Sequence, residues 1–298
     1  MGESPISVSE QVDVFGASHR LVGVSSAPAQ RVERDPRPAV ILLNSGLIHR
    51  VGPKRLSVRL ARSLSRQGAV ALRFDVSGLG DSEPRRDGIS IVDGVIRDTQ
   101  EAMDHLEKCY GVGSFLLMGV CSGAMVSFVT ALEDPRVVAA VLIDPQDFGA
   151  SHLASPAAKE STFVRHYWRL VRSKPVTGQR LIRVLTGKSN YKRFLEVAAA
   201  QVAGLFSRRD GSSLASEHLI GQFQQLGDRG VRVLLVYTEK GESLDYFDLT
   251  LAVHLDRLRG KSRIDVEVIP GADHDFSLPE SQKRLVRLVT DWVESASG

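Results

Sequence analysis

Apolar and polar positions form alternating blocks along the chain, and these blocks predict strands and helices in turn. The short runs before residue 147 are apolar rather than alternating, as expected for strands of a parallel sheet that helices cover on both faces. Between them, apolar residues recur at helical spacing. The predicted strands are AVILLN, VALRFDV, FLLMG, VVAAVLID, VRVLLVYT and RIDVEVI, and the predicted helices are 54–67, 92–109, 124–132, 245–259 and 279–295. This βαβ pattern predicts an α/β protein.

Two segments depart from the βαβ pattern. Near the N-terminus, residues 12–15 and 20–25 are joined by FGAS and predict an antiparallel hairpin that precedes the sheet. Residues 147–225 have little strand character and carry helical apolar spacing. We therefore predict a helical cap at 147–225, inserted into a core that is made of residues 1–146 and 226–298.

The composition fits a globular chain. Its 298 residues are 43% hydrophobic, which is enough to bury a large core. The longest apolar run, Val137 to Ile143, is far shorter than the roughly 20 residues that cross a bilayer. The N-terminal residues have no basic region followed by an apolar stretch. We expect a cytoplasmic protein without a membrane span.

The cysteines and charges narrow the possible ligands. Cys109 and Cys121 are too few for a disulfide framework, and no Cys/His cluster has zinc-ligand spacing, so we expect neither a metal site nor another cofactor. The net charge of +3 is too small to indicate nucleic-acid binding. Residues 151–213, however, carry 12 Lys or Arg against 3 Asp or Glu. Such a surface suits an acidic partner, and a solvated helical face is the alternative.

The stretch MGVCSG contains the spacing of a nucleophile elbow, G-x-Nuc-x-G. Cys121 stands at the nucleophile position between Gly119 and Gly123. A side chain at such a tight strand-to-helix turn lies near the positive end of a helix, which stabilises a thiolate. Ser122 is one residue out of the glycine frame, so we expect its backbone N–H, rather than its hydroxyl, to take part. Cys109 closes an amphipathic helix and is expected to be structural.

Three further segments accompany the elbow. FDVSGLGDS resembles the turn at a strand end of α/β-hydrolases, NSGL follows the strand that supplies their oxyanion hole, and PGADHDF places His274 after the last predicted strand. With these segments the chain resembles the α/β-hydrolase superfamily over nearly its whole length, cap included. Cysteine elbows occur there in dienelactone hydrolases and polyhydroxyalkanoate synthases. The segment NSGLIHRVGPKR is similar to hydrolases associated with bacterial exosortase systems.

The resemblance implies an α/β-hydrolase fold and a specific set of site residues. Cys121 would be the nucleophile and His274 the base. The backbone N–H groups of Ser122 and of Leu47, or Gly46, would form the oxyanion hole. Two residues just beyond the oxyanion segment are candidates for substrate contacts, with a solvated loop as the alternative for each: His49 and Arg50.

The acid of the triad departs from the superfamily pattern. The turn after VLLVYT commonly supplies an Asp about three residues beyond the strand, and Gly241 stands there. We rank Glu242 first, Asp245 second and Asp147, which follows an earlier strand, third. Each could instead cap a helix or lie on the surface. A cysteine nucleophile depends less on the acid than a serine does, because its thiolate forms more readily.

The cysteine also bears on the substrate. An acyl-enzyme on cysteine is itself a thioester, so loading it from a thioester is nearly isoenergetic, whereas loading from an ordinary ester is uphill. This favours a thioesterase or acyltransferase over a carboxylesterase or lactone hydrolase. A basic cap suits an acyl group on coenzyme A or an acidic acyl carrier protein, which would dock on Lys188, Lys192, Arg193, Arg208 and Arg209. A non-catalytic ligand-binding protein is a third hypothesis, although such proteins usually lose part of the triad.

Overall fold

The computed structural model divides the chain into two units, Met1–Phe148 with Leu219–Gly298 and Gly149–His218. The predicted cap at 147–225 lies largely outside the described residues and stays a prediction. The structure describes residues 7–17, 20–30, 37–145, 148, 212–239, 243–244, 247–248, 251–254 and 263–296.

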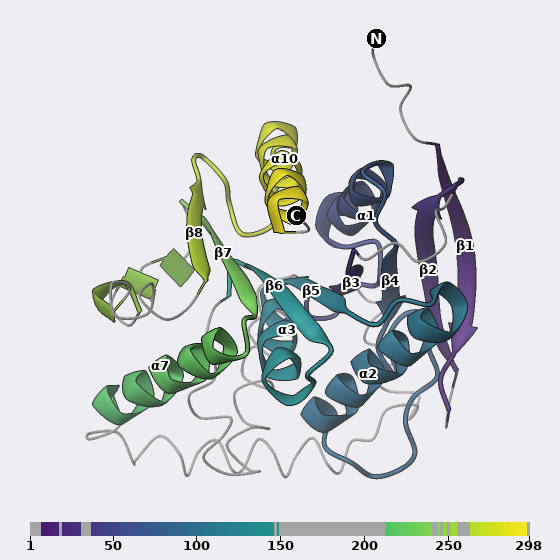
Figure 1. The fold of residues 1–298 in the computed structure, drawn as a ribbon, viewed down its shortest axis with the longest axis horizontal. Coiled ribbons are helices and arrows are strands. Elements are labelled where there is room, and N and C mark those ends of the chain that lie inside the picture. The colour runs from purple at the N-terminus through teal and green to yellow at the C-terminus, as the bar shows by residue number, and fades with distance from the viewer. Residues whose placement is uncertain are drawn as a thin grey trace, which may run out of the picture. The chain divides into compact units, whose positions relative to one another are not determined.

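An eight-stranded sheet forms the centre of the first unit, with the strand order β1-β2-β4-β3-β5-β6-β7-β8 (Figure 1). β1 pairs with β2 and β2 with β4 in antiparallel fashion, and all other neighbours are parallel. The predicted hairpin and mostly parallel sheet are therefore confirmed. The strands are β1 (Val8–Phe15), β2 (Leu21–Pro28), β3 (Ala39–Leu43), β4 (Ala71–Asp75), β5 (Phe115–Val120), β6 (Val137–Ile143), β7 (Arg232–Thr238) and β8 (Ile264–Ile269).

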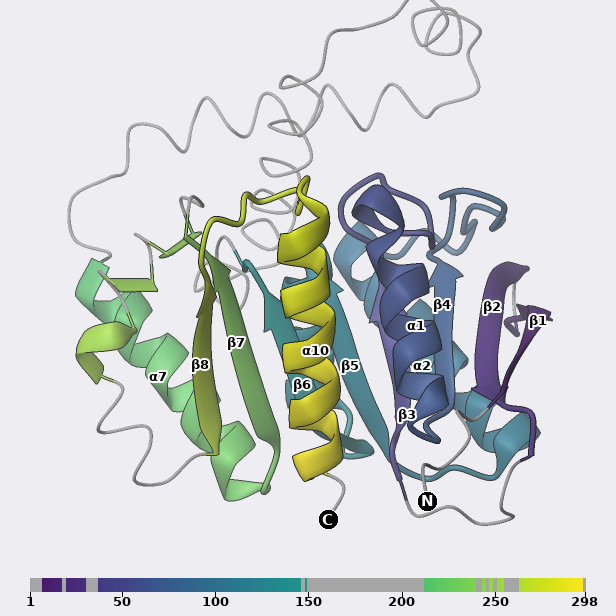
Figure 2. The same ribbon diagram turned by 90° about the horizontal axis from the view of Figure 1, so that it is seen from above.

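Helices cover both faces of this sheet, which is why β3, β4 and β5 are buried at every position. α1 and α10 pack together on one face, and α2, α3 and α7 lie on the other (Figures 1 and 2). On the second face, Phe223 of α7 packs against Phe128 of α3 and against Phe148. The helices are α1 (Leu56–Arg66), α2 (Ile91–Tyr110), α3 (Ser122–Glu133), α7 (Ser212–Asp228) and α10 (Pro279–Ala296).

Local signals set several helix boundaries. α2 begins after Ser90, whose hydroxyl accepts a hydrogen bond from the Asp93 N–H, and it ends at Gly111 with φ 65°. A 3₁₀ turn, η1 (Pro53–Arg55), precedes α1, so that helix starts two residues later than predicted. A second turn, η2 (Ala252–His254), falls within the helix predicted at 245–259. None of the helices in the described part of the chain is long and apolar enough to cross a membrane.

The carboxyl ends of the parallel strands place the candidate site. In the register of the sheet, Gly119 of β5 lies opposite Leu43 of β3 on one side and Leu142 of β6 on the other. The loop after β5 is therefore flanked by the loop after β3 and by the residues after β6. Parallel sheets commonly bind ligands at this edge.

Candidate active site

Cys121 lies at the turn between β5 and α3. Its φ of 62° and ψ of −117° form a backbone conformation that is costly for a residue other than glycine. The flanking glycines make this turn possible. A Cβ atom on Gly119 would lie 2.2 Å from the carbonyl carbon of Gly123, and one on Gly123 would lie 2.7 Å from the carbonyl oxygen of Asn44. The glycine spacing therefore reflects a close approach between the elbow and the loop after β3.

His274 lies in the loop between β8 and α10 and is hydrogen-bonded to both Cys121 and Asp144. Its Nδ1 contacts Asp144 Oδ2, which leaves Nε2 for the Cys121 sulfur. Burial by itself lowers the pKa of the imidazole, but the hydrogen bonds and charges of Asp144 and Cys121 outweigh burial and raise the pKa to about 10. At neutral pH the imidazole is therefore protonated and stabilises a thiolate beside it.

Asp144 directly follows β6, with a φ of 48° and a fully buried side chain. Its Oδ1 accepts hydrogen bonds from the backbone N–H of Thr238, at 3.2 Å, and from the hydroxyl of Ser243. Its Oδ2 contacts His274. Burial raises the pKa of this carboxyl, but the hydrogen bonds more than compensate, so the pKa lies below its ordinary value. The side chain is thus a fixed anion that orients the imidazole.

Asp144 is not one of the three acids ranked from the sequence. Glu242, Asp245 and Asp147 all lie outside the described residues. In the segment DPQD after β6, the structure places the first Asp, Asp144, against His274, whereas the sequence favours the second, Asp147. The available signal was an Asp-Pro pair directly after a buried strand.

The oxyanion side of the site lies in the loop after β3. Ser122 is the first residue of α3, and the first N–H groups of a helix have no acceptor within it. The N–H of Gly46 donates to Ser122 Oγ at 2.7 Å, so this amide is already used. The N–H of Leu47 has no acceptor among the residues that the structure describes. Of the two alternatives, Leu47 is thus the one whose N–H is left for another acceptor, and the oxyanion hole stays a prediction.

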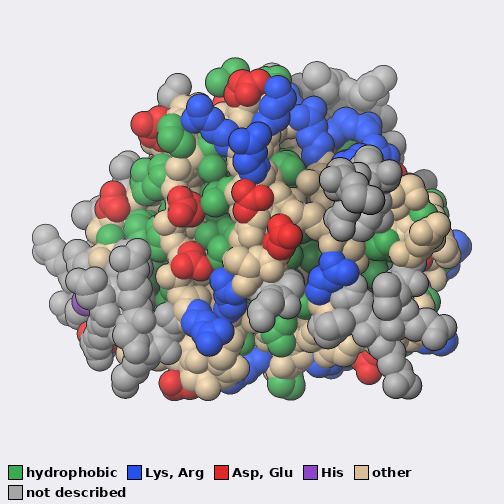
Figure 3. All heavy atoms as spheres, turned by 45° about the horizontal axis from the view of Figure 1, so that its top comes forward, with side chains coloured by type: hydrophobic (Ala, Val, Ile, Leu, Met, Phe, Trp, Pro, Cys, Tyr) green, Lys and Arg blue, Asp and Glu red, His purple; other side chains and the backbone are tan. Residues whose placement is uncertain are grey.

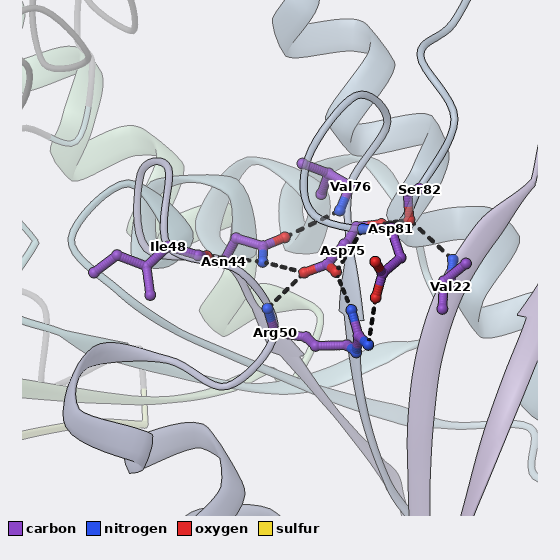
Figure 4. Close-up of polar contacts among 8 residues, drawn as sticks. All are labelled: Val22, Asn44, Ile48, Arg50, Asp75, Val76, Asp81 and Ser82. Atoms are coloured by element: carbon purple, nitrogen blue, oxygen red, sulfur yellow. Dashed lines mark hydrogen bonds and ion pairs between the residues drawn. The ribbon is translucent and has the colours of Figure 1, made fainter. Parts of the chain in front are cut away.

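Arg50 and His49 differ in their surroundings. The Arg50 guanidinium contacts the Asp75 carboxylate and lies 2.7 Å from Asp81 Oδ2 (Figure 4). Burial lowers the pKa of Arg50, but the two carboxylates raise it by more than burial lowers it, so Arg50 stays a cation. Arg50 is thus held by protein carboxylates, and its contact with substrate stays a prediction. His49 is exposed in the same loop.

The ligand predictions reach beyond the described residues. Where the structure describes the chain, no group of three or more His, Cys, Asp or Glu side chains could hold a metal ion. The basic residues predicted to dock an acidic carrier are outside it: Lys188, Lys192, Arg193, Arg208 and Arg209.

A family model described as Serine aminopeptidase, S33, matches residues 35–195 of the chain. A search of curated proteins found no match. Among solved structures, an esterase from Pyrococcus furiosus is 13% identical, with 96% of this chain and 91% of that chain covered and a TM-score of 0.58. A dienelactone hydrolase from Anabaena variabilis is 14% identical, with 97% and 98% covered and a TM-score of 0.55.

A serine hydrolase homologue from Coxiella burnetii is similar to the same extent, with 15% identity, 94% of this chain and 96% of that chain covered, and a TM-score of 0.54. Likeness at these identities shows the fold alone. The α/β-hydrolase fold that the sequence predicted is therefore confirmed.

Proposed function

We propose that this chain, which belongs to the hydrolase family described as serine aminopeptidase, S33, forms an acyl-enzyme on Cys121. The observation that carries the proposal is the hydrogen-bonded series from Cys121 through His274 to the buried Asp144. The family and fold support a hydrolase, but they do not support a cysteine nucleophile. That assignment, including Asp144 as the acid, rests on the geometry of the described residues.

The first half-reaction would use the thiolate of Cys121. Its attack on the substrate carbonyl carbon forms a C–S bond and places a negative charge on the oxygen, which accepts hydrogen bonds from the N–H groups of Ser122 and Leu47. The tetrahedral intermediate then collapses and the bond to the leaving group breaks. The imidazolium of His274 protonates that leaving group.

The second half-reaction releases the acyl group. Neutral His274 removes a proton from water as the water oxygen bonds to the acyl carbon, and the C–S bond breaks to restore the thiolate and the imidazolium. An alcohol or amine in place of water would give acyl transfer. Asp144 keeps Nδ1 of His274 oriented and stabilises the imidazolium in both steps.

The substrate that suits this site best is an acyl thioester, because thioester exchange with Cys121 is nearly isoenergetic. We therefore propose a thioesterase or acyltransferase. Figure 3 shows Lys and Arg side chains gathered over one part of the surface. The segment that directly follows the loop of Leu47 also carries exposed cations, which would attract the phosphates of coenzyme A or an acidic carrier protein. These cations are Lys54, Arg55, Arg59 and Arg66.

Intact mass spectrometry after incubation with an acyl-coenzyme A and with a p-nitrophenyl ester tests the proposal. We expect an acyl adduct on Cys121 with both reagents, formed faster from the thioester, and no adduct at this position in Cys121→Ala. Cys109→Ala is the matched control and should acylate like the wild type. Reversible binding without any adduct would indicate a non-catalytic binding protein. Turnover of esters or lactones but not of thioesters would favour a carboxylesterase or lactone hydrolase.

A further inference from the structure

The loop formed by residues 44–50 is attached at both ends to one buried carboxylate. Asp75, the last residue of β4, has a side chain with no exposed surface. At the start of the loop, Asn44 Nδ2 lies 3.3 Å from Asp75 Oδ1. At its end, the backbone N–H of Arg50 donates to the same oxygen at 2.5 Å, and the guanidinium contacts Oδ2 (Figure 4). Two points six residues apart in the loop thus converge on Asp75.

The remaining contacts of Asn44 shape the loop between these points. Its Nδ2 also donates to the carbonyl oxygen of Ile48 at 3.1 Å, and its Oδ1 accepts from the Val76 N–H at 3.0 Å. In the middle of the loop, Gly46 donates to Ser122 of the elbow. The amide of Leu47 lies next to this last contact, so its position depends on the whole set.

Close packing around the Asp75 carboxylate leaves no room for a side chain at position 80. Gly80, with φ of 55°, approaches so closely that a Cβ atom there would lie 2.1 Å from Asp75 Oδ2. A carboxylate only accepts hydrogen bonds, and every group that contacts Oδ1 or Oδ2 here is a donor. An amide in its place would turn its NH₂ group toward at least one of those donors.

We infer that Asp75 is a positioning residue, which fixes the 44–50 loop so that the Leu47 N–H meets the oxyanion. Arg50 is its counter-ion and links it to Asp81 on the surface, where the Asp81 side chain is 65% exposed. The inference rests on the proposed acyl-enzyme chemistry, since only a reaction that forms an oxyanion needs this amide in place. Asp75 itself touches no reacting atom.

Two reactions of the Cys121 thiolate distinguish a misplaced oxyanion donor from general damage to the site. Acylation of Cys121 by a p-nitrophenyl ester forms an oxyanion, whereas alkylation by iodoacetamide forms an S–C bond and releases iodide without one. Losing one oxyanion donor costs about 10²–10³-fold in kcat, and a displaced donor costs less, so we expect Asp75→Asn to slow acylation about 10–100-fold. KM should change little, and the alkylation rate should stay within about twofold of wild type.

Arg50→Lys is the second variant, for use if Asp75→Asn does not fold. Lysine keeps a positive charge near Asp75 but lacks the planar guanidinium, which contacts Asp75 and Asp81 together. Acylation should therefore slow less than in Asp75→Asn. Arg136→Gln is the matched control. Arg136 forms an ion pair of 2.9 Å with the nearly buried Asp134. Both residues precede β6 and so lie at the opposite end of that strand from Asp144. This control should lose stability without losing acylation.

The outcomes distinguish the inference from the proposed function. Acylation of Asp75→Asn at the wild-type rate would overturn the positioning role alone. A parallel fall in acylation and alkylation would also overturn it, because the variant would then have disturbed Cys121 itself. If the wild type is alkylated but never acylated, the proposed function fails.

Discussion

Two Cys-His-Asp groups occur in the described part of the chain, and they differ in what surrounds them. One joins Cys121, His274 and Asp144. The other lies between α2 and β1, where Cys109 Sγ is 3.7 Å from His105 Nδ1 and His105 Nε2 is 3.3 Å from Asp13 Oδ1. In both groups the carboxylate is nearly or fully buried and its pKa lies below the ordinary value. The side-chain order alone does not separate them.

The backbone around each cysteine makes the difference. Cys109 lies in the last turn of α2, where the amides are used by helical hydrogen bonds, and its side chain is exposed to water. Cys121 is 1% exposed and precedes α3, whose first amides have no helical acceptor, with the 44–50 loop packed against the elbow. An active site of this type therefore needs amides aimed at the oxyanion as well as a thiol, a base and an acid.

Removing the thiol of each group should give the largest difference in kcat between the two groups. We expect Cys121→Ala to lower kcat by about 10³-fold or more with any acyl substrate, because the covalent step is lost. Cys109→Ala should stay within about twofold of wild type, because the amides around that sulfur are used by the hydrogen bonds of α2. Steady-state kinetics on both variants, with circular dichroism to confirm folding, measures this. Near-normal turnover by Cys121→Ala would reject the assignment of the nucleophile.

Replacing the sulfur of each group by oxygen should give the next largest difference in kcat between the two groups. A hydroxyl is not ionised by the neighbouring imidazolium as a thiol is, so Cys121→Ser should reduce kcat by about 10²-fold or more. Cys109→Ser should have no measurable effect on kcat. Equal activity of Cys121→Ser and wild type would mean that the site works equally well with the serine that the family description names.

Removing each carboxylate charge tests the acid. Asp144→Asn should lower kcat by about 10–100-fold, because His274 loses its fixed anionic partner; the loss is smaller than in serine triads since a thiolate forms more readily. Asp13→Asn should leave kcat unchanged and reduce stability. A single-turnover assay gives the acylation rate directly. If Asp144→Asn is as active as Asp13→Asn, the site operates as a Cys-His dyad.

The two halves of the site differ in how far the sequence could predict them. The elbow is local: the glycine spacing around Cys121 reports a turn that only small neighbours permit, and His274 follows a strand whose pattern is plain. The acid is not local. Asp144 meets His274 across β7, so its identification requires knowing which strand ends are neighbours in the sheet.

Arg50 illustrates the same limit. From the sequence it is a charged residue beside the oxyanion segment, which suggests a contact with substrate. Its partner Asp75 is 25 residues away and meets it because β3 and β4 are adjacent in the sheet. Pairings of this kind depend on strand order, whereas most strands and the α/β class follow from periodicity.

The smallest expected effect is on stability, and it separates the two groups by pH. His274 has a pKa of about 10 in the folded protein against an ordinary value of 6.5. Between these two values the imidazole is protonated in the folded protein and neutral in the unfolded chain. The hydrogen bonds of the imidazolium therefore stabilise the fold fully only below pH 6.5. The stability difference between wild type and His274→Asn should therefore be largest below pH 6.5 and disappear as the pH rises through 10. Asp13 has a lowered pKa, so its contribution to stability is present above pH 3.8 and is lost as the pH falls.

Urea unfolding of wild type, His274→Asn and Asp13→Asn between pH 3 and 10.5 measures both trends. A His274→Asn difference that stays constant from pH 6 to pH 10.5 would contradict the imidazolium pairing on which the proposed chemistry depends.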